Sequence, residues 1–149
     1  MSNESLISYG KRSDKAMKTW VQISKTFNKF FTTELKYFSE YSLTFNQFKV
    51  LEVLYHRGDL NITSITKLTT STPGNITVVV RNLKRDGLIH SLCDPKDKRA
   101  SILSISEEGR KIIASLFPQH AKNITSYMDV LDDEELETLR ILLKKVYKK

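Results

Sequence analysis

The sequence predicts a mainly α-helical protein with one small β-hairpin, and three observations support this fold class. Only five glycines and three prolines interrupt the 149 residues, so most of the chain is free to form long helices. Apolar residues recur every three to four positions in both terminal regions, which is the period of a helix with one buried face. Two short apolar runs, residues 88–93 and 100–105, have the length of paired strands.

The first half of the chain contains three predicted helices with recognisable ends. The first begins near Ser13 and carries an apolar stripe at helical spacing. Thr44 and Gln47 have the spacing of a capping box that opens a second helix, and Gly58 is expected to end it. Asn61 is a candidate N-cap for a short third helix. The stripe of the first helix consists of Trp20, Ile23, Phe27, Phe30, Phe31, Leu35 and Phe38.

Residues 71–84 carry conflicting signals. Five consecutive β-branched residues, 76–80, favour a strand. Thr72 as N-cap, Pro73 at the first helical position and Gly87 as a stop favour a helix. We predict a helix, because the caps agree with the apolar period whereas propensity is a weak signal. The residues that fall on one apolar helical face are Ile76, Val79, Val80 and Leu83.

The second half is predicted to begin with a hairpin and to end with two helices. The strands flank a charged turn at residues 94–99. Ser106 opens a long helix that Pro118 is expected to kink or split, and Asp132 with Glu135 caps the last helix. The apolar residues of that last helix are Leu136, Leu139, Leu142, Leu143 and Val146.

The net charge of +7 is distributed unevenly along the sequence. Residues 67–99 hold seven basic and three acidic side chains, whereas residues 106–138 hold three basic and eight acidic ones. Residues 139–149 add five basic side chains and no acidic one. A basic excess permits an anionic partner such as nucleic acid, although charge alone does not identify it.

Several classes of protein are excluded or disfavoured. A single cysteine, Cys93, rules out an intramolecular disulfide, and His56, His90 and His120 show no metal-ligand spacing with it. No apolar run is long enough to span a bilayer, and the polar start lacks an export signal. No nucleophile motif or phosphate-binding loop is present. We therefore expect a cytoplasmic protein that is not an enzyme, needs no cofactor or metal, and has no membrane partner.

The order helix, short helix, capped helix and hairpin predicts a helix-turn-helix followed by a wing. In such a motif the second helix of the pair enters the DNA major groove. If the apolar face of residues 73–85 points inward, Arg81 points outward, where it could contact guanine, and Val78 could touch a thymine methyl group. The predicted DNA-binding residues of this helix are Ser71, Thr72, Pro73, Gly74, Asn75, Thr77, Val78, Arg81, Lys84 and Arg85.

The charged turn of the hairpin is the second predicted DNA contact. Lys96, Lys98 and Arg99 place three cations on a projecting loop, where a phosphate or minor-groove contact is geometrically easy. Asp97 is interpreted as a partner that orients Arg99, because a free carboxylate there would repel phosphate. On the helix alone, the cations are equally well explained as a solvated surface.

The chain resembles the MarR family of multiple-antibiotic-resistance-type regulators along nearly its whole length. The motifs that carry the resemblance are Leu43-Thr44-Phe45-Asn46-Gln47-Phe48, Ser71-Thr72-Pro73-Gly74-Asn75-Ile76-Thr77, Gly87-Leu88-Ile89, Asp94-Pro95-Lys96-Asp97-Lys98-Arg99 and Ser106-Glu107-Glu108-Gly109. The resemblance implies one MarR-type domain over residues 1–149, with a winged helix-turn-helix lobe at 43–105 and dimerisation helices at 1–42 and 106–149. It also implies a homodimer that reads a pseudo-palindrome in double-stranded DNA as a transcriptional regulator of the repressor type.

In many members of this family a small aromatic or phenolic ligand releases the DNA. The candidate effector pocket consists of aromatic residues at helical spacing, although such stripes normally serve to pack a plain core. These residues are Trp20, Phe27, Phe31, Phe38, Tyr41 and Phe45. Two other functions remain open, namely a winged-helix module that binds an acidic protein and an architectural protein that binds DNA without regard to sequence.

Overall fold

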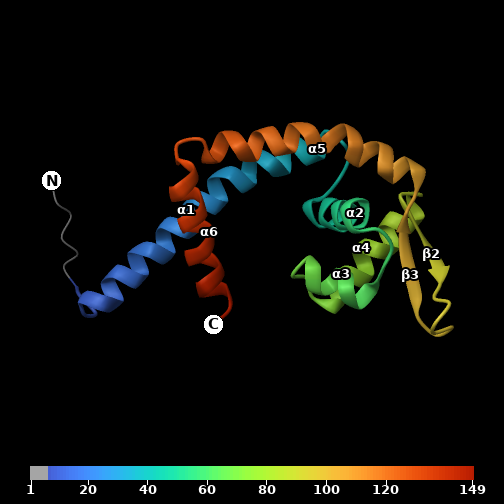
Figure 1. Cartoon of the computed structure of the whole chain (residues 1–149), viewed down its shortest axis with the longest axis horizontal. Helices are drawn as coiled ribbons and strands as arrows, with labels where there is room; N and C mark the ends of the chain where they lie inside the picture. Colours follow the sequence, from blue (N-terminus) through green and yellow to red (C-terminus); the bar gives the residue numbers. More distant parts are fainter. Residues whose placement is uncertain (1–6) are drawn as a thin grey trace. The chain divides into compact units, whose positions relative to one another are not determined.

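The computed structural model describes residues 7–149, and within them the chain forms six α-helices and three β-strands (Figure 1). The chain divides into two compact units, the first ending at Tyr37 and the second running from Phe38 to Lys149. The elements are α1 (Lys11–Ser39), α2 (Phe45–Arg57), β1 (Leu60–Asn61), α3 (Ile62–Leu68), α4 (Pro73–Arg85), β2 (Ile89–Cys93), β3 (Ser101–Ile105), α5 (Glu107–Met128) and α6 (Asp133–Tyr147).

Helix α1 supplies the regular structure of the described part of the first unit. Asp14 lies in its first turn, accepts a hydrogen bond from the Ser8 hydroxyl at 2.5 Å and another from the Tyr9 amide at 3.0 Å, and so ties the preceding loop to the helix. These hydrogen bonds, the one from Ser8 first, lower the pKa of the Asp14 carboxyl. Phe27 stacks on Phe31 with ring centroids 4.9 Å apart.

The predicted helix ends in the second unit are confirmed. Thr44 accepts a hydrogen bond from the Gln47 amide at 3.2 Å and donates its own amide to the Gln47 side chain at 2.9 Å, which completes the capping box. Gly58 ends α2 with a φ of +82°, a conformation that favours glycine. The Asn61 side chain accepts from the Ser64 amide at 2.8 Å and starts α3.

The hairpin is confirmed, and a third strand joins it. Strands β2 and β3 pair antiparallel with Ile89 opposite Ile105, and β1 pairs with the other edge of β3, giving the order β1-β3-β2. The sequence does not predict β1, because two residues are too few to show an alternating pattern.

Helix α5 is continuous from Glu107 to Met128, so the expected split at Pro118 does not occur. A proline removes one backbone donor from a helix and also crowds the preceding turn, which costs stability without having to end the helix. Ile113 and Leu116 are fully buried just before Pro118, and this packing holds the helical turns on that side. No helix within residues 7–149 is both long and apolar enough to cross a membrane.

The core of the second unit lies where α2, α4 and α5 meet the small sheet. Phe38 is completely buried and stacks on Phe48 with ring centroids 4.1 Å apart. Helix α4 contributes the face that its sequence period predicts, because Ile76, Val79, Val80 and Leu83 are all buried. The helical interpretation of residues 71–84 is therefore confirmed, and the strand propensity of residues 76–80 is overridden by burial of this face.

Candidate nucleic-acid interface

The start of α4 is built by side chains that the sequence singled out as DNA contacts. Thr72 is the N-cap, and its hydroxyl accepts a hydrogen bond from the Asn75 amide at 3.4 Å. Pro73 occupies the first turn, and its carbonyl accepts a hydrogen bond from the Thr77 hydroxyl at 2.9 Å. Gly74 has open space where a side chain would stand. The turn is thus capped and exposed, and Gly74 leaves room for another backbone to approach.

The outward side of α4 combines small, apolar and cationic residues. Gly74, Thr77, Val78 and Arg81 are exposed and are called the reading face below. Val78 leaves 48% of its surface exposed. A single exposed valine is common on protein surfaces, so Val78 is a candidate contact only together with the cationic and small residues of the same face.

Two further cations flank the reading face. Lys84 is exposed, and within residues 7–149 it makes no ion pair, nor does Arg81. Arg85 instead lies 3.1 Å from the carboxylate of Asp86. Among the described residues of α4, Arg81 and Lys84 are therefore the cations best placed to meet an anion.

The turn that precedes α4 is held by a lysine from another helix. Lys49 in α2 donates from its ammonium to the Thr69 carbonyl at 2.8 Å, with the Ser71 hydroxyl at 3.5 Å. The same ammonium lies 5.1 Å from the centre of the Phe45 ring, and burial lowers its pKa. Sequence reasoning missed Lys49, because a lysine inside an amphipathic helix gives no sign of a partner twenty positions away.

The hairpin turn is ordered by two aspartates. The Asp94 side chain accepts from the Lys96 amide at 2.8 Å, and the Asp97 side chain accepts from the Arg99 amide at 2.9 Å. Asp97 thus contacts Arg99, as its predicted role requires, but through the backbone amide and not through the guanidinium group. The side chains of Lys96, Lys98 and Arg99 are exposed on this turn.

The base of the hairpin is locked to the start of α5. The Ser106 hydroxyl donates to the Gly87 carbonyl at 2.7 Å and accepts from the Gly109 amide at 3.1 Å, and the Ser106 amide donates to the Leu88 carbonyl at 2.9 Å. A Cβ on Gly109 would overlap the Leu88 carbonyl oxygen and lie 2.9 Å from Ile105 Cγ1. The Gly-Leu-Ile and Ser-Glu-Glu-Gly motifs therefore meet at one tight junction that fixes the wing on α5.

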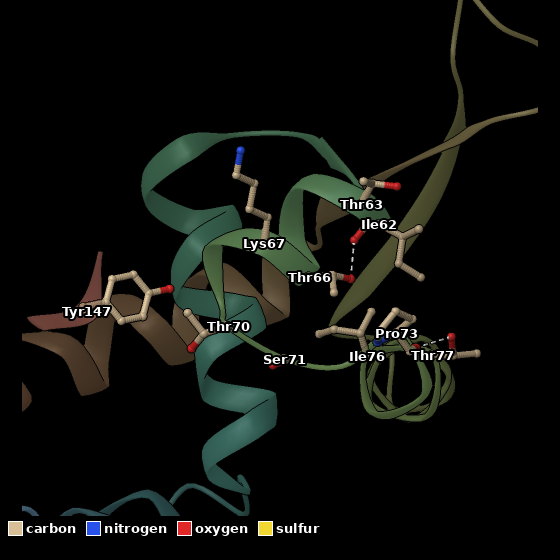
Figure 2. Close-up of a pocket in the computed structure, with 10 residues that line it drawn as sticks. All are labelled: Ile62, Thr63, Thr66, Lys67, Thr70, Ser71, Pro73, Ile76, Thr77 and Tyr147. Atoms are coloured by element: carbon tan, nitrogen blue, oxygen red, sulfur yellow. Dashed lines mark hydrogen bonds between the residues drawn. The ribbon is translucent and has the colours of Figure 1, made fainter. Parts of the chain in front are cut away.

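The residues proposed for an effector pocket have different environments. Trp20 is 69% exposed and Phe27 is also exposed, both in the first unit. In the second unit Phe38 is a core residue, whereas Tyr41 and Phe45 are half-buried. A cavity of about 470 Å³ has a different lining, made by α3, the following turn, the start of α4 and Tyr147 (Figure 2).

Helix α6 presents an apolar face that the rest of the second unit does not cover. Leu136, Leu139, Leu142, Leu143 and Val146 are all exposed, and no residue of α6 is buried. A leucine-rich stripe at helical spacing on a capped helix is typical of a helix that packs against a partner.

The histidines and the cysteine do not gather into a site. Within residues 7–149 there is no cluster of three or more His, Cys, Asp or Glu side chains suited to a metal ion. Cys93 is exposed at the end of β2 as a free thiol.

A short helix, a turn, a capped helix with an exposed mixed face and a hairpin with a cationic tip define a winged helix-turn-helix protein. Residues 43–101 match the family model described as MarR family. The HTH-type transcriptional regulator MhqR of Bacillus subtilis is 31% identical over 134 residues, which cover 90% of this chain and 92% of that protein. The chain belongs to the MarR family of DNA-binding transcriptional regulators.

Other relatives and solved structures agree with this assignment. The HTH-type transcriptional repressor YetL of Bacillus subtilis is 30% identical over 101 residues, covering 66% of this chain and 60% of that protein. A mutant of Escherichia coli MarR, solved in complex with operator DNA, has the same fold with a TM-score of 0.77 at 24% identity, over 89% of this chain and 96% of that one. Bordetella bronchiseptica BpsR, whose DNA binding is regulated by 6-hydroxynicotinic acid, has a TM-score of 0.78 at 21% identity, over 86% and 91%.

Proposed function

We propose that this regulator is a homodimer that reads a pseudo-palindromic operator in double-stranded DNA and represses transcription. Residues 43–105 form the DNA-binding lobe, and residues 1–42 and 106–149 supply the dimerisation helices. It acts by binding and not by catalysis, in the cytoplasm with the DNA. The repressor role is supported by the relative YetL, which is named a repressor.

The reading face of α4 is the observation that carries this proposal. Its exposed Val78 and Arg81 offer one apolar and one cationic group on neighbouring turns of a helix. In the major groove, valine can contact the thymine methyl group and arginine can form two hydrogen bonds with guanine. Such contacts to base edges discriminate between base pairs, whereas contacts to phosphate do not.

The flanking groups supply affinity rather than sequence discrimination. Ser71, Thr72, Asn75 and Lys84 surround the start and flank of α4, where they can meet phosphates. The hairpin turn contacts the adjacent DNA backbone or minor groove through Lys96, Lys98 and Arg99. Asp97 stabilises this turn by accepting a hydrogen bond from the Arg99 amide. Contacts to phosphate position a protein on the duplex but carry no sequence information.

Selection of bound duplexes from a random DNA library tests the proposal. A dimer with two identical reading faces should enrich a motif with two-fold symmetry whose half-site centres lie one helical turn apart, about 10 base pairs or 34–36 Å. Enrichment of a single unpaired half-site would contradict the dimer, and the absence of any enriched motif would contradict sequence reading.

A small aromatic ligand is proposed to release the operator. The support is that the DNA binding of BpsR, which has a similar fold, is regulated by 6-hydroxynicotinic acid. The aromatic side chains of the N-terminal region remain the candidate contacts for such a ligand. Release follows if the ligand has a higher affinity for a protein conformation that cannot hold both half-sites than for the conformation that can. A titration of operator complex with 6-hydroxynicotinic acid and a panel of phenols measures this. No release by any of them would contradict it.

A further inference from the structure

The turn between α3 and α4 has an unusual backbone that needs an anchor. Thr70 has a φ of +50°, in the left-handed region that residues with a side chain rarely adopt. Two residues later Thr72 caps α4, so any rotation of this turn changes the direction in which the reading face points. Thr69 is 3% exposed, and its hydroxyl donates to the Ile65 carbonyl at 2.7 Å, which ties the turn to the end of α3.

One side of the turn faces open space. Thr70 and Ser71 line the cavity of about 470 Å³ together with Pro73 and Ile76 (Figure 2). Atoms that border a cavity lack packing partners on that side and can move at little cost. On the cavity side the turn therefore lacks side-chain packing, and it is held there by backbone hydrogen bonds from the Thr70 amide to the Lys67 carbonyl at 3.3 Å and from the Ser71 amide to the Thr66 carbonyl at 3.1 Å.

The Lys49 ammonium is an anchor of the turn that comes from another helix. It reaches across from α2 to the Thr69 carbonyl at 2.8 Å, a length expected for a charge-assisted hydrogen bond. The side chain packs its cation over the Phe45 ring and lies near the Ser71 hydroxyl, so three different groups fix its position. Burial opposes the charge, which lowers the pKa of Lys49.

We propose that Lys49 is a positioning residue for DNA reading, which sets the angle of α4 by binding the Thr69 carbonyl and does not touch DNA itself. This inference rests on the proposed function, because it concerns how the reading face is aimed. It separates Lys49 from the exposed lysines and arginines of the interface, which would contact the DNA directly.

Replacement of the ammonium tests the assignment. Lys49→Met keeps the length and apolar stem of the side chain but removes the cationic donor, so the Thr69 carbonyl retains only the Thr70 hydroxyl at 2.7 Å and the Ser71 hydroxyl at 3.4 Å. We expect the affinity for the selected operator to fall about tenfold, the effect of losing one charge-assisted hydrogen bond from the binding-competent conformation. The affinity for random duplex should stay within about twofold, and the slope of log affinity against log salt should not change, because no phosphate contact is lost.

Two further variants make the test specific. Lys49→Arg retains a cationic donor and should restore operator affinity to within about threefold of the wild type. Lys111→Met removes an exposed lysine of α5 that pairs with Glu108, so it controls for loss of one charge and should leave the ratio of operator to random affinity unchanged. If Lys49→Met does not fold, Lys49→Gln is read in its place.

The outcomes distinguish this inference from the proposed function. A wild-type protein that binds operator and random duplex equally would overturn the proposed function, and the inference with it. A wild type that discriminates, with an unchanged ratio in Lys49→Met, would overturn the inference alone, even if the variant melts earlier. Equal losses on both duplexes with a shallower salt slope would make Lys49 a phosphate contact and would also overturn it.

Discussion

The apolar face of α6 leads to a quantitative prediction about the dimer. Leu142 is 55% exposed and the neighbouring Ile141 is 51% exposed, so the two side chains lose nearly the same surface when truncated to alanine. They differ in direction. Leu142 lies within the stripe of Leu136, Leu139, Leu143 and Val146, whereas Ile141 points to the other side of the helix, since successive residues are about 100° apart.

The expected magnitude follows from these exposures. Complete burial of a leucine stabilises by about 1.5–3 kcal/mol, and Leu142 has roughly half of its surface left to bury. A two-fold dimer buries two copies, so Leu142→Ala should weaken the dimer by about 1.5–3 kcal/mol, or about 10- to 150-fold in the dimer dissociation constant. Ile141→Ala should change it less than about threefold. Alanine is the better helix former in both variants, so neither should unfold α6.

Sedimentation equilibrium over a wide range of protein concentrations measures both dissociation constants. Equal effects of the two variants would mean that the leucine stripe is not the dimer contact. A wild-type protein that stays monomeric at micromolar concentration would refute the dimer itself.

Three other predictions concern the interface and the helix ends. Arg81→Ala should cost about 1–3 kcal/mol of operator affinity and relax the preference at one operator position, and equal losses on random duplex would instead mean that Arg81 grips phosphate. Gly109→Ala should lower the free energy of unfolding by about 1–3 kcal/mol, as overpacking does, because the added Cβ overlaps the Leu88 carbonyl oxygen; denaturant unfolding measures it, and an unchanged midpoint would contradict the tight junction. Asp14 should titrate below its ordinary pKa of 3.8 because it accepts the Ser8 hydrogen bond. Because the pKa of the Asp14 carboxyl is lower in the folded than in the unfolded state, the ionised carboxylate stabilises the fold above pH ~4. This stabilisation is lost as the pH falls through the pKa of the folded state. A carboxyl NMR titration should show the midpoint rising in Ser8→Ala, and an unshifted midpoint would contradict the bond.

The features that sequence reasoning predicted correctly are those that depend on nearby residues. Capping at Thr44, Asn61 and Thr72 depends on a side chain and on the backbone amide three positions later, and the structure shows each of these hydrogen bonds. The helical period of α4 also outweighed the strand propensity of residues 76–80, because four apolar residues on one face could all be buried.

The features that sequence reasoning missed depend on residues far apart in the sequence. The Lys49 contact spans twenty positions, and β1 exists only because Leu60 and Asn61 lie against β3, about forty residues later. Of the two outcomes expected at Pro118, a kink or a split, the split does not occur, since packing of Ile113 and Leu116 in the core outweighs the local cost of proline. The direct partner of Asp97 could not be chosen either, because the backbone and side-chain donors of Arg99 are equally near in sequence.

The distribution of charge fits the proposed separation of a DNA-binding lobe from dimerisation helices. The excess of four positive charges in residues 67–99 falls on the end of α3, on α4 and on the hairpin turn. The acidic residues of 106–138 fall on the start of α5, on the turn that follows α5 and on the start of α6. A basic surface at the reading face attracts DNA, and an acidic surface elsewhere disfavours nonspecific wrapping.

The most direct test of sequence-specific reading is the affinity of the intact protein for its selected operator and for random duplex across a series of salt concentrations. A sequence-specific regulator should bind the operator about a thousandfold or more tightly than random DNA, and both affinities should fall as salt rises. A steep salt dependence with equal affinity for both duplexes would identify an architectural DNA-binding protein. Weak binding to both at every salt concentration would identify a module for a protein partner, and either result would contradict the account.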